Sequence, residues 1–215
     1  MRKALEIGGM VAAVVLIAFG IGAIVIGANG KSTVSSNLKE QKIVGTPDMT
    51  PAGIKAEAAK SGLDVSTLTI PTCTAANKPV EDGTSARCFA QYMKIHALEA
   101  TGGQLYSQMP RYETADGKGT NVEALALKQG GKPIDNPARE VWIQETALST
   151  ALNTSYMASQ IALFGIVVGV ALLLSGVGFG ILALGGALRN RDSALAKLQS
   201  HDRADGSGAA APTPA

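Results

Sequence analysis

Residues 136–188 read NPAREVWIQETALSTALNTSYMASQIALFGIVVGVALLLSGVGFGILALGGAL, and this stretch decides the fold. Asn136 is a favourable helix N-cap, and Pro137 suits the first helical turn, where no backbone donor is needed. The rest of the stretch has no proline, and after Glu145 it has no charge. The section 161–188 is longer than the ~20 apolar residues that a helix needs to cross a bilayer. The stretch therefore predicts one helix that begins outside a membrane and ends within it.

A second apolar run, residues 7–28, lies near the N-terminus and follows Arg2 and Lys3. The apolar region of a signal peptide is shorter, at roughly 7–15 residues. The run is therefore predicted to be an uncleaved transmembrane anchor. A small-residue site around Ala28 and Gly30 leaves cleavage open as the alternative.

Basic residues flank both predicted spans on the sides away from the central segment. Arg2 and Lys3 precede the first span, and the second is followed by Arg189, Arg191, Lys197 and Arg203. The positive-inside rule then predicts a plasma-membrane protein with both termini in the cytoplasm. The predicted organisation is a cytoplasmic N-terminus at 1–6, spans at 7–28 and 161–188, an exterior domain at 29–160 and a cytoplasmic tail at 189–215. In the tail we expect a short charged helix to about His201 and a disordered end.

Composition excludes some classes of function. Charged residues make up 17% of the chain, against about 25% in a soluble domain. The net charge of +2, without a basic stripe, gives no reason to expect nucleic acid as a partner. Neither predicted span contains an ionisable residue, so transport by this chain alone is not expected.

Both predicted spans carry small residues at helical spacing. They are Gly9, Ala13, Gly20 and Gly27 in the first span and Gly165, Gly169, Gly176 and Gly180 in the second. Small residues let helix backbones approach closely in lipid, where burial of apolar surface gives no drive. We therefore expect the spans to pack on each other or on a partner. The alternative is that glycine is simply frequent in membrane helices.

The two cysteines, Cys73 and Cys88, lie in the predicted exterior segment and are separated by turn-forming residues. Two cysteines in an exported segment predict a disulfide. A reactive thiol or a metal pair is the alternative, but the spacing is unlike a CxxC motif and no further soft ligand is near. The fold class predicted is thus a mainly α membrane protein with a small, mostly helical, disulfide-stapled exterior domain between two transmembrane helices.

Helical elements account for most of this exterior segment. The first helix is expected to continue past Lys31 by two or three turns, and a second to run from Thr50–Pro51 to Gly62. A third is expected at 86–101, and a short fourth at 121–129. The side chains expected to point inward are Phe89, Tyr92, Met93, His96 and Ala100 in the third helix, Val122, Leu125 and Leu127 in the fourth, and Val141, Trp142, Glu145, Leu148, Leu152 and Tyr156 in the long helix. Residues 63–70 alternate partly and are expected to be extended.

Two features carry potential function. His96 is the only histidine of the predicted exterior domain, and a lone histidine among apolar neighbours is more often a core residue than a ligand. Glu99, one turn further on, could orient it. Met109, Arg111 and Tyr112 are candidate partner-binding residues, because Met, Arg and Tyr are enriched in interface cores. The alternative is that these side chains pack beneath the helix at 86–101.

Four blocks of sequence resemble a family of uncharacterised actinobacterial two-span membrane proteins. They are RCFAQYMKIHALEATGG at 87–103, QMPRY at 108–112, NPAREVW at 136–142 and ETALSTALNTSYMA at 145–158. The resemblance implies two spans and an exterior domain and brings no catalytic residues. Members of the family often carry the label of aromatic ring-opening dioxygenase. A facial-triad iron site needs two histidines and a carboxylate, whereas His96 and His201 are predicted on opposite sides of the membrane, so the label is not adopted.

The leading functional hypothesis is a membrane-anchored interaction or structural module of the cell envelope, without catalytic residues, cofactor or metal. Its expected partners are membrane lipid and another membrane or envelope protein, or a second copy of the chain. A sensor or small-ligand binder is the alternative. An envelope hydrolase with His96 as general base comes third.

Overall fold

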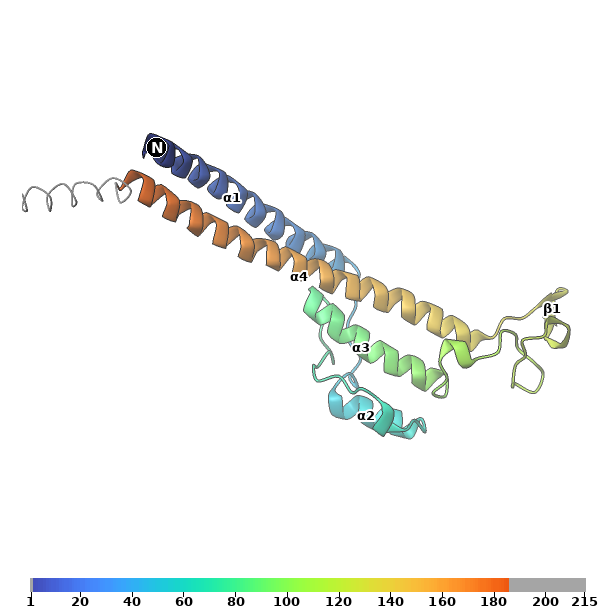
Figure 1. Cartoon of the computed structure of the whole chain (residues 1–215). Coiled ribbons are helices and arrows are strands. Elements are labelled where there is room, and N and C mark those ends of the chain that lie inside the picture. Colours follow the sequence, from blue (N-terminus) through green and yellow to red (C-terminus); the bar gives the residue numbers. More distant parts are fainter. Residues whose placement is uncertain (1, 186–215) are drawn as a thin grey trace, which may run out of the picture. The chain divides into compact units, whose positions relative to one another are not determined.

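A computed structural model describes residues 2–185 and shows a mainly helical chain (Figure 1). Its α-helices are α1 (Arg2–Glu40), α2 (Pro51–Lys60), α3 (Gly83–Ala100) and α4 (Pro137–Leu184). Two short antiparallel strands, β1 (Lys128–Gln129) and β2 (Lys132–Pro133), form a hairpin. The last residues of the second predicted span, the tail at 189–215 and His201 lie outside the described residues.

The chain forms two compact units. Unit 1 consists of Met1–Ala28 and Phe164–Ala215, and unit 2 of Asn29–Leu163. Helices α1 and α4 contribute residues to both units. The predicted candidate functional residues outside the spans all fall in unit 2.

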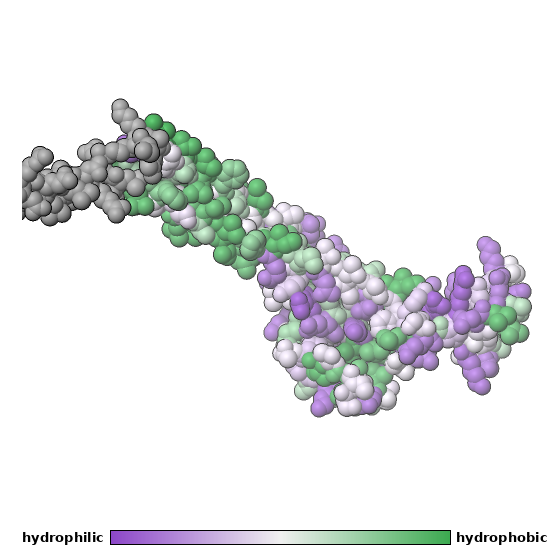
Figure 2. Space-filling model, in the orientation of Figure 1, coloured by the Kyte–Doolittle hydropathy of each residue, from purple (hydrophilic) through white to green (hydrophobic). Residues whose placement is uncertain are grey.

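Helices α1 and α4 are both long and apolar enough to cross a membrane. In their most apolar 18-residue stretches, only 11% and 17% of residues are buried. The core helix of a soluble protein would be mostly buried, so these helices present their apolar side chains outward. Figure 2 shows this as green surface along both helices of unit 1.

Within unit 1, α1 and α4 touch through glycines. A Cβ atom added at Gly20 would lie 2.7 Å from the Gly169 carbonyl oxygen, and one at Gly169 would lie 2.9 Å from the Ile24 nitrogen. A Cβ at Gly176 would meet the Ala13 carbonyl oxygen at 2.9 Å. A Cβ added at Gly9, Gly165 or Gly180 would be in ordinary van der Waals contact with the opposite helix, at 3.5–3.8 Å. Gly20, Gly169 and Gly176 therefore lie at close approaches of the two backbones.

The main core of unit 2 lies between α2, α3 and the unit-2 part of α4. Ile54, Ala58, Phe89, Tyr92 and Leu152 are all buried in it. The Tyr92 hydroxyl donates to the Cys73 carbonyl, which satisfies the one polar group of the ring. A smaller cluster of Ala97, Met109 and Trp142 lies beside it, and the Trp142 Nε1–H donates to the Gln104 carbonyl at 2.8 Å.

Side-chain caps fix the starts of the unit-2 helices. The Thr50 hydroxyl accepts from the Gly53 N–H at 2.9 Å, and Pro51 occupies the first turn of α2, as predicted. The Asn136 side chain accepts from the Ala138 N–H at 3.0 Å at the start of α4, also as predicted. Asp82 and Ser85 form a capping box at α3, which therefore begins at Gly83 rather than at the predicted residue 86.

The predicted disulfide between Cys73 and Cys88 is present. It ties the loop before α3 to the first turns of that helix, beside the buried Tyr92. The disulfide therefore holds the irregular loop before α3 against the main core.

Three expectations about local structure were wrong. Residues 63–70 contain a 3₁₀ turn at Val65–Thr67, because the Asp64 carboxylate accepts from the Ser66 N–H and competes with extended backbone. Ala100 is exposed rather than inward. The helix expected at 121–129 is only a 3₁₀ turn at Glu123–Leu125 followed by β1.

The hairpin explains the last difference. Gly130 and Gly131 both have positive φ, 59° and 79°, as a type I′ turn requires, and this turn favours antiparallel strands over a helix. The backbone of Leu127 bonds to Glu113 and Ile134 instead of to its own helical turn. Val122, Leu125 and Leu127 are consequently exposed, not inward.

A valine in place of Gly169 should separate α1 and α4 in unit 1, because its side chain would meet backbone atoms of Gly20 and Ile24. Overpacking of this kind costs about 1–3 kcal/mol. The readout is oxidative cross-linking of a Gly9→Cys, Ala183→Cys chain, whose Cβ positions are 3.5 Å apart. Gly169→Val should slow formation of the intrachain cross-link. Gly178→Val is the matched control, since nothing lies within 4 Å of Gly178; equal cross-linking in both variants would contradict the contact.

Loss of the disulfide should destabilise unit 2. Closing a loop of 15 residues stabilises by about 3 kcal/mol in the chain-entropy model. A Cys73→Ser, Cys88→Ser variant should therefore unfold at lower denaturant concentration, as followed by Trp142 fluorescence in detergent. Reducing agent should shift the wild-type curve to that of the variant and leave the variant unchanged; an unshifted wild-type curve after confirmed reduction would contradict it.

Candidate functional site

His96 lies between two carboxylates in unit 2. Its Nε2 atom is 3.1 Å from Asp48 Oδ2, and its Nδ1 atom is 3.4 Å from Glu99 Oε2. Glu99 follows one turn later on α3, whereas Asp48 belongs to the loop before α2. The three side chains are between 13% and 29% exposed, so the cluster is largely shielded from water. The imidazole therefore lies between a carboxylate of the loop before α2 and one of α3 itself.

The attraction in this cluster is electrostatic rather than a set of aligned hydrogen bonds. Asp48 Oδ2, His96 Nε2 and Glu99 Oε1 are buried atoms without a hydrogen-bond partner. The Nε2 and Oδ2 atoms are 3.1 Å apart but lack the alignment that a hydrogen bond requires. Of the two carboxylate neighbours of His96, Glu99 was predicted from sequence spacing, and Asp48 was not.

Burial raises the pKa of the Glu99 carboxyl above its ordinary value. The positive charge on His96 opposes this effect, while the Asp48 and Glu57 carboxylates reinforce it. The raised pKa means that the folded state holds a proton on Glu99 more tightly than the unfolded chain does. Several negative charges therefore compete for one imidazole.

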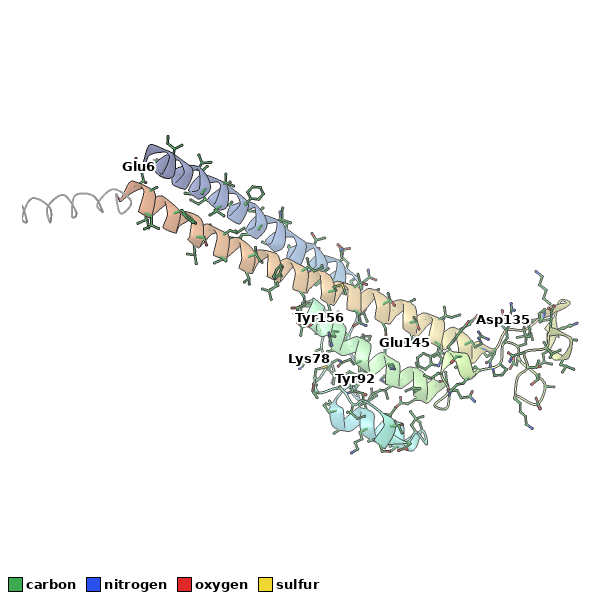
Figure 3. The ribbon with its side chains drawn as sticks, in the orientation of Figure 1. Glu6, Lys78, Tyr92, Asp135, Glu145 and Tyr156 are labelled. Carbon is green, nitrogen blue, oxygen red and sulfur yellow. A yellow bond between two sulfur atoms is a disulfide. The ribbon has the colours of Figure 1, made fainter. Side chains whose placement is uncertain are left out.

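A cavity of about 300 Å³ adjoins His96 between α3 and α4. Glu145, on the facing side of α4, lines it and is only 8% exposed. Its Oε1 atom accepts the Ser149 hydroxyl at 2.6 Å, so the buried carboxylate has a local partner. Figure 3 shows Glu145 on the part of α4 that runs beside α3. The remaining lining residues are Met93, Ala97, Ala100, Val141, Gln144 and Leu148.

The chemistry available to this cluster is limited. In residues 2–185, the polar partners of the imidazole are the two carboxylates, and no hydroxyl nucleophile is hydrogen-bonded to it. Over the same residues, no group of three or more His, Cys, Asp or Glu side chains could hold a metal ion. A base with an orienting carboxylate is therefore present, but a nucleophile within its reach is not.

A larger cleft, of about 520 Å³, lies elsewhere in unit 2 along α3 and the 3₁₀ turn at Val65–Thr67. Apolar side chains of Leu63, Leu68, Ile95 and Leu105 line it together with the polar side chains of Asp64, Gln91, Lys94 and Gln108. Small-molecule sites are concave and mostly apolar, whereas polar and apolar side chains line this cleft in similar proportion. No sequence motif indicated it, because its walls come from segments far apart in the chain.

The three predicted partner-binding residues are differently placed. Met109 and Tyr112 are buried, 4% and 6% exposed, and Met109 packs with Trp142 and Ala97. Met109 and Tyr112 therefore pack in the interior, which was the alternative to partner binding for these side chains. Arg111 is exposed, and its guanidinium lies 5.0 Å from the Tyr112 ring centroid. Partner binding by this segment stays a prediction and depends on Arg111.

A set of exposed apolar side chains between residues 105 and 143, here called the 105–143 surface, was not predicted. It consists of Leu105, Tyr106, Val122, Leu125, Leu127 and Ile143, each between 38% and 67% exposed. The helix expected at 121–129 would have buried three of them. Their exposure therefore becomes evident only once the hairpin is known. Figure 2 shows green patches among hydrophilic residues in the part of unit 2 that carries β1.

Comparisons with protein-family models, curated proteins and solved structures give no match for this chain.

Replacing Glu99 by Gln should change how stability depends on pH. A carboxyl with a raised folded pKa contributes stability that is fully present below its unfolded value and is lost as pH rises through the folded value. Glu99→Gln removes this loss, so its stability relative to wild type should increase from pH 4 to pH 7. Urea unfolding of the detergent-solubilised chain at several pH values measures the difference. Glu123→Gln, at an exposed position, is the control; parallel curves for Glu99→Gln and wild type would contradict the assignment.

Proposed function

We propose that the chain is a two-span membrane protein whose unit 2 is an extracytoplasmic module that docks another envelope protein. The observation that carries the proposal is the 105–143 surface, because large apolar side chains held in water are costly to leave uncovered. The Arg111 side chain, exposed in the same segment, supplies a charged group at its rim.

Membrane insertion is supported by the outward-facing apolar side chains of α1 and α4. Lipid is the solvent that removes the cost of that exposure. The disulfide supports an oxidising location for unit 2, since such bonds persist outside the cytoplasm. The basic residues before the first span and after the second favour cytoplasmic termini.

Lipid is not the expected cover for the 105–143 surface. Ile143 precedes the predicted start of the second span, residue 161, by 18 positions on the continuous helix α4. At 1.5 Å per residue this separation is about 27 Å, which exceeds the thickness of a headgroup layer. A protein partner with an apolar face is therefore the occupant that fits.

The surface is also preorganised. Tyr112 exchanges backbone hydrogen bonds with Thr120 in both directions at 2.9 Å. The Asn136 side chain donates to the Pro110 carbonyl at 3.1 Å, which joins this segment to the start of α4. The Arg139 guanidinium stacks 4.1 Å from the Tyr106 ring centroid. Such a fixed surface can bind without losing much conformational freedom.

A second candidate is a small-ligand binder. The cleft of about 520 Å³ favours it, because its volume lies in the range of small-molecule sites. Ligand binding and partner docking would use different residues, since of the 105–143 surface only Leu105 also lines the cleft.

Polar substitution of the 105–143 surface should abolish docking. A Val122→Ser, Leu125→Gln, Leu127→Ser variant, affinity-purified from native membranes in mild detergent, should lose proteins that co-purify with wild type in stoichiometric amount. Because apolar anchors dominate interfaces, we expect about a tenfold or greater loss of recovered partner. Quantitative mass spectrometry of the eluates measures it.

Val44→Ser is the matched control, because Val44 is as exposed as Val122, at 53%, and lies outside the surface. It should retain the partner. If wild type elutes as a monomer without a stoichiometric partner, or if the triple variant keeps one, the docking proposal is wrong. Recovery of a second copy of the chain alone would replace an envelope partner by self-association.

A further inference from the structure

A polar cleft of about 380 Å³ lies within unit 2 among α1, the start of α3 and α4. Its walls carry charges of both signs and few apolar groups. The lining residues are Lys31, Ser35, Lys39, Glu81, Asp82, Gly83, Thr84, Ser159, Gln160 and Leu163. Neither the candidate site at His96 nor the 105–143 surface includes any of them.

Two contacts fix the shape of this cleft. Gly83 lies so close to α4 that an added Cβ would be 2.8 Å from the Tyr156 Cα and 2.6 Å from the Ser159 Oγ. The Ser35 hydroxyl of α1 donates to the Glu81 carbonyl at 2.8 Å. The segment 81–84 is thereby held between the two long helices, and the cleft is a formed feature of unit 2.

The charges of the cleft are arranged in two groups. Lys31 and Lys39 are eight residues apart on α1 and so share one face of that helix. Glu81 and Asp82 line the same cleft and belong to the segment that leads into α3. The Ser85 N–H, which donates to the Asp82 carboxylate at 2.7 Å, lowers the pKa of that carboxyl, and Lys31 adds to the effect. In the described part of the chain, neither lysine forms an ion pair with a carboxylate.

Chain connectivity puts the cleft next to the predicted spans. Lys31 follows Ala28, the last residue of the first span, by three positions in the same helix, a rise of about 4.5 Å. Gln160 and Leu163 lie at the start of the second predicted span. In a two-span topology these residues stand at the depth of the lipid headgroups, and Lys39 stands about 12 Å further out.

We propose that this cleft binds the headgroup of a zwitterionic phospholipid with a primary ammonium, a phosphatidylethanolamine. The phosphate lies against Lys31, at headgroup depth, and the ammonium lies against Glu81 and Asp82. The proposal rests on the exterior location of unit 2 given above. It does not depend on the docking of a protein partner.

Charge complementarity selects this headgroup over others. Phosphate oxygens accept charge-assisted hydrogen bonds from lysine, and a primary ammonium donates to carboxylates. A purely anionic headgroup would leave its charge facing Glu81 and Asp82. A quaternary ammonium has no N–H to donate, so phosphatidylcholine would lose the contacts to these two carboxylates.

Native mass spectrometry of the full chain in mild detergent tests the proposal. Dioctanoyl phosphatidylethanolamine, phosphatidylcholine and phosphatidylglycerol are titrated separately, and bound lipids are counted. Wild type should bind one phosphatidylethanolamine at least about tenfold more tightly than either other lipid, since two charged contacts distinguish them. Lys31→Gln with Lys39→Gln should lower this affinity about tenfold or more. Glu81→Gln should lower it for phosphatidylethanolamine and not for phosphatidylglycerol.

Lys55→Gln is the control, because Lys55 is exposed on α2 and away from the cleft. Equal binding of the three lipids, or unchanged binding in the double lysine variant with an intact disulfide, would overturn the proposal. Competition by inorganic phosphate at the lipid's own concentration would also overturn it, in favour of a simple anion site.

The same variants separate this inference from the proposed function. A chain that loses lipid selectivity but keeps its protein partner leaves docking intact. Thiol labelling of Lys31→Cys in intact cells reports the topology of the chain. Labelling only from the cytoplasmic side would contradict the exterior location of unit 2 and, with it, the headgroup assignment.

Discussion

Gly20 and Gly169 approach each other so closely that a single added carbon on either would meet backbone atoms of the opposite helix. In the proposed membrane location, burial of apolar surface would not drive these helices together, and close packing of their backbones would contribute instead. The absence of side chains at these positions is what permits it. Helices α1 and α4 contribute residues to both units, and this contact lies within unit 1.

Unit 2 is small, and its stability has three separate sources. A compact apolar core centres on Tyr92, Ile54 and Leu152. The disulfide reduces the freedom of the unfolded chain around the loop before α3. Contacts of the His96 side chain with Asp48 and Glu99 bring the loop before α2 against α3. A cluster that serves this purpose needs no nucleophile and no metal, which agrees with its lack of a hydroxyl partner.

The surfaces of unit 2 divide by chemistry. One is apolar and fixed by backbone hydrogen bonds, and suits a protein partner. Another is a cleft with two charges of each sign beside the predicted spans, and suits a lipid headgroup. Contact with the membrane through the cleft would orient such a module. Contact through the apolar surface would recruit it to a protein partner. These roles are compatible, because they share no residue.

Sequence alone determined the features that depend on local composition and chain length. The two long apolar helices, the caps at Thr50 and Asn136 and the pairing of the only two cysteines were predicted, because each follows from a few neighbouring residues or from elimination. Tertiary structure decided the rest. Asp48 reaches His96 only through the fold, Met109 and Tyr112 are buried by contacts distant in sequence, and Val122, Leu125 and Leu127 are exposed because a glycine turn favours a hairpin over a helix. The physical reason is that periodicity reports which side chains could share a face, while long-range packing and backbone hydrogen bonds select which face is covered.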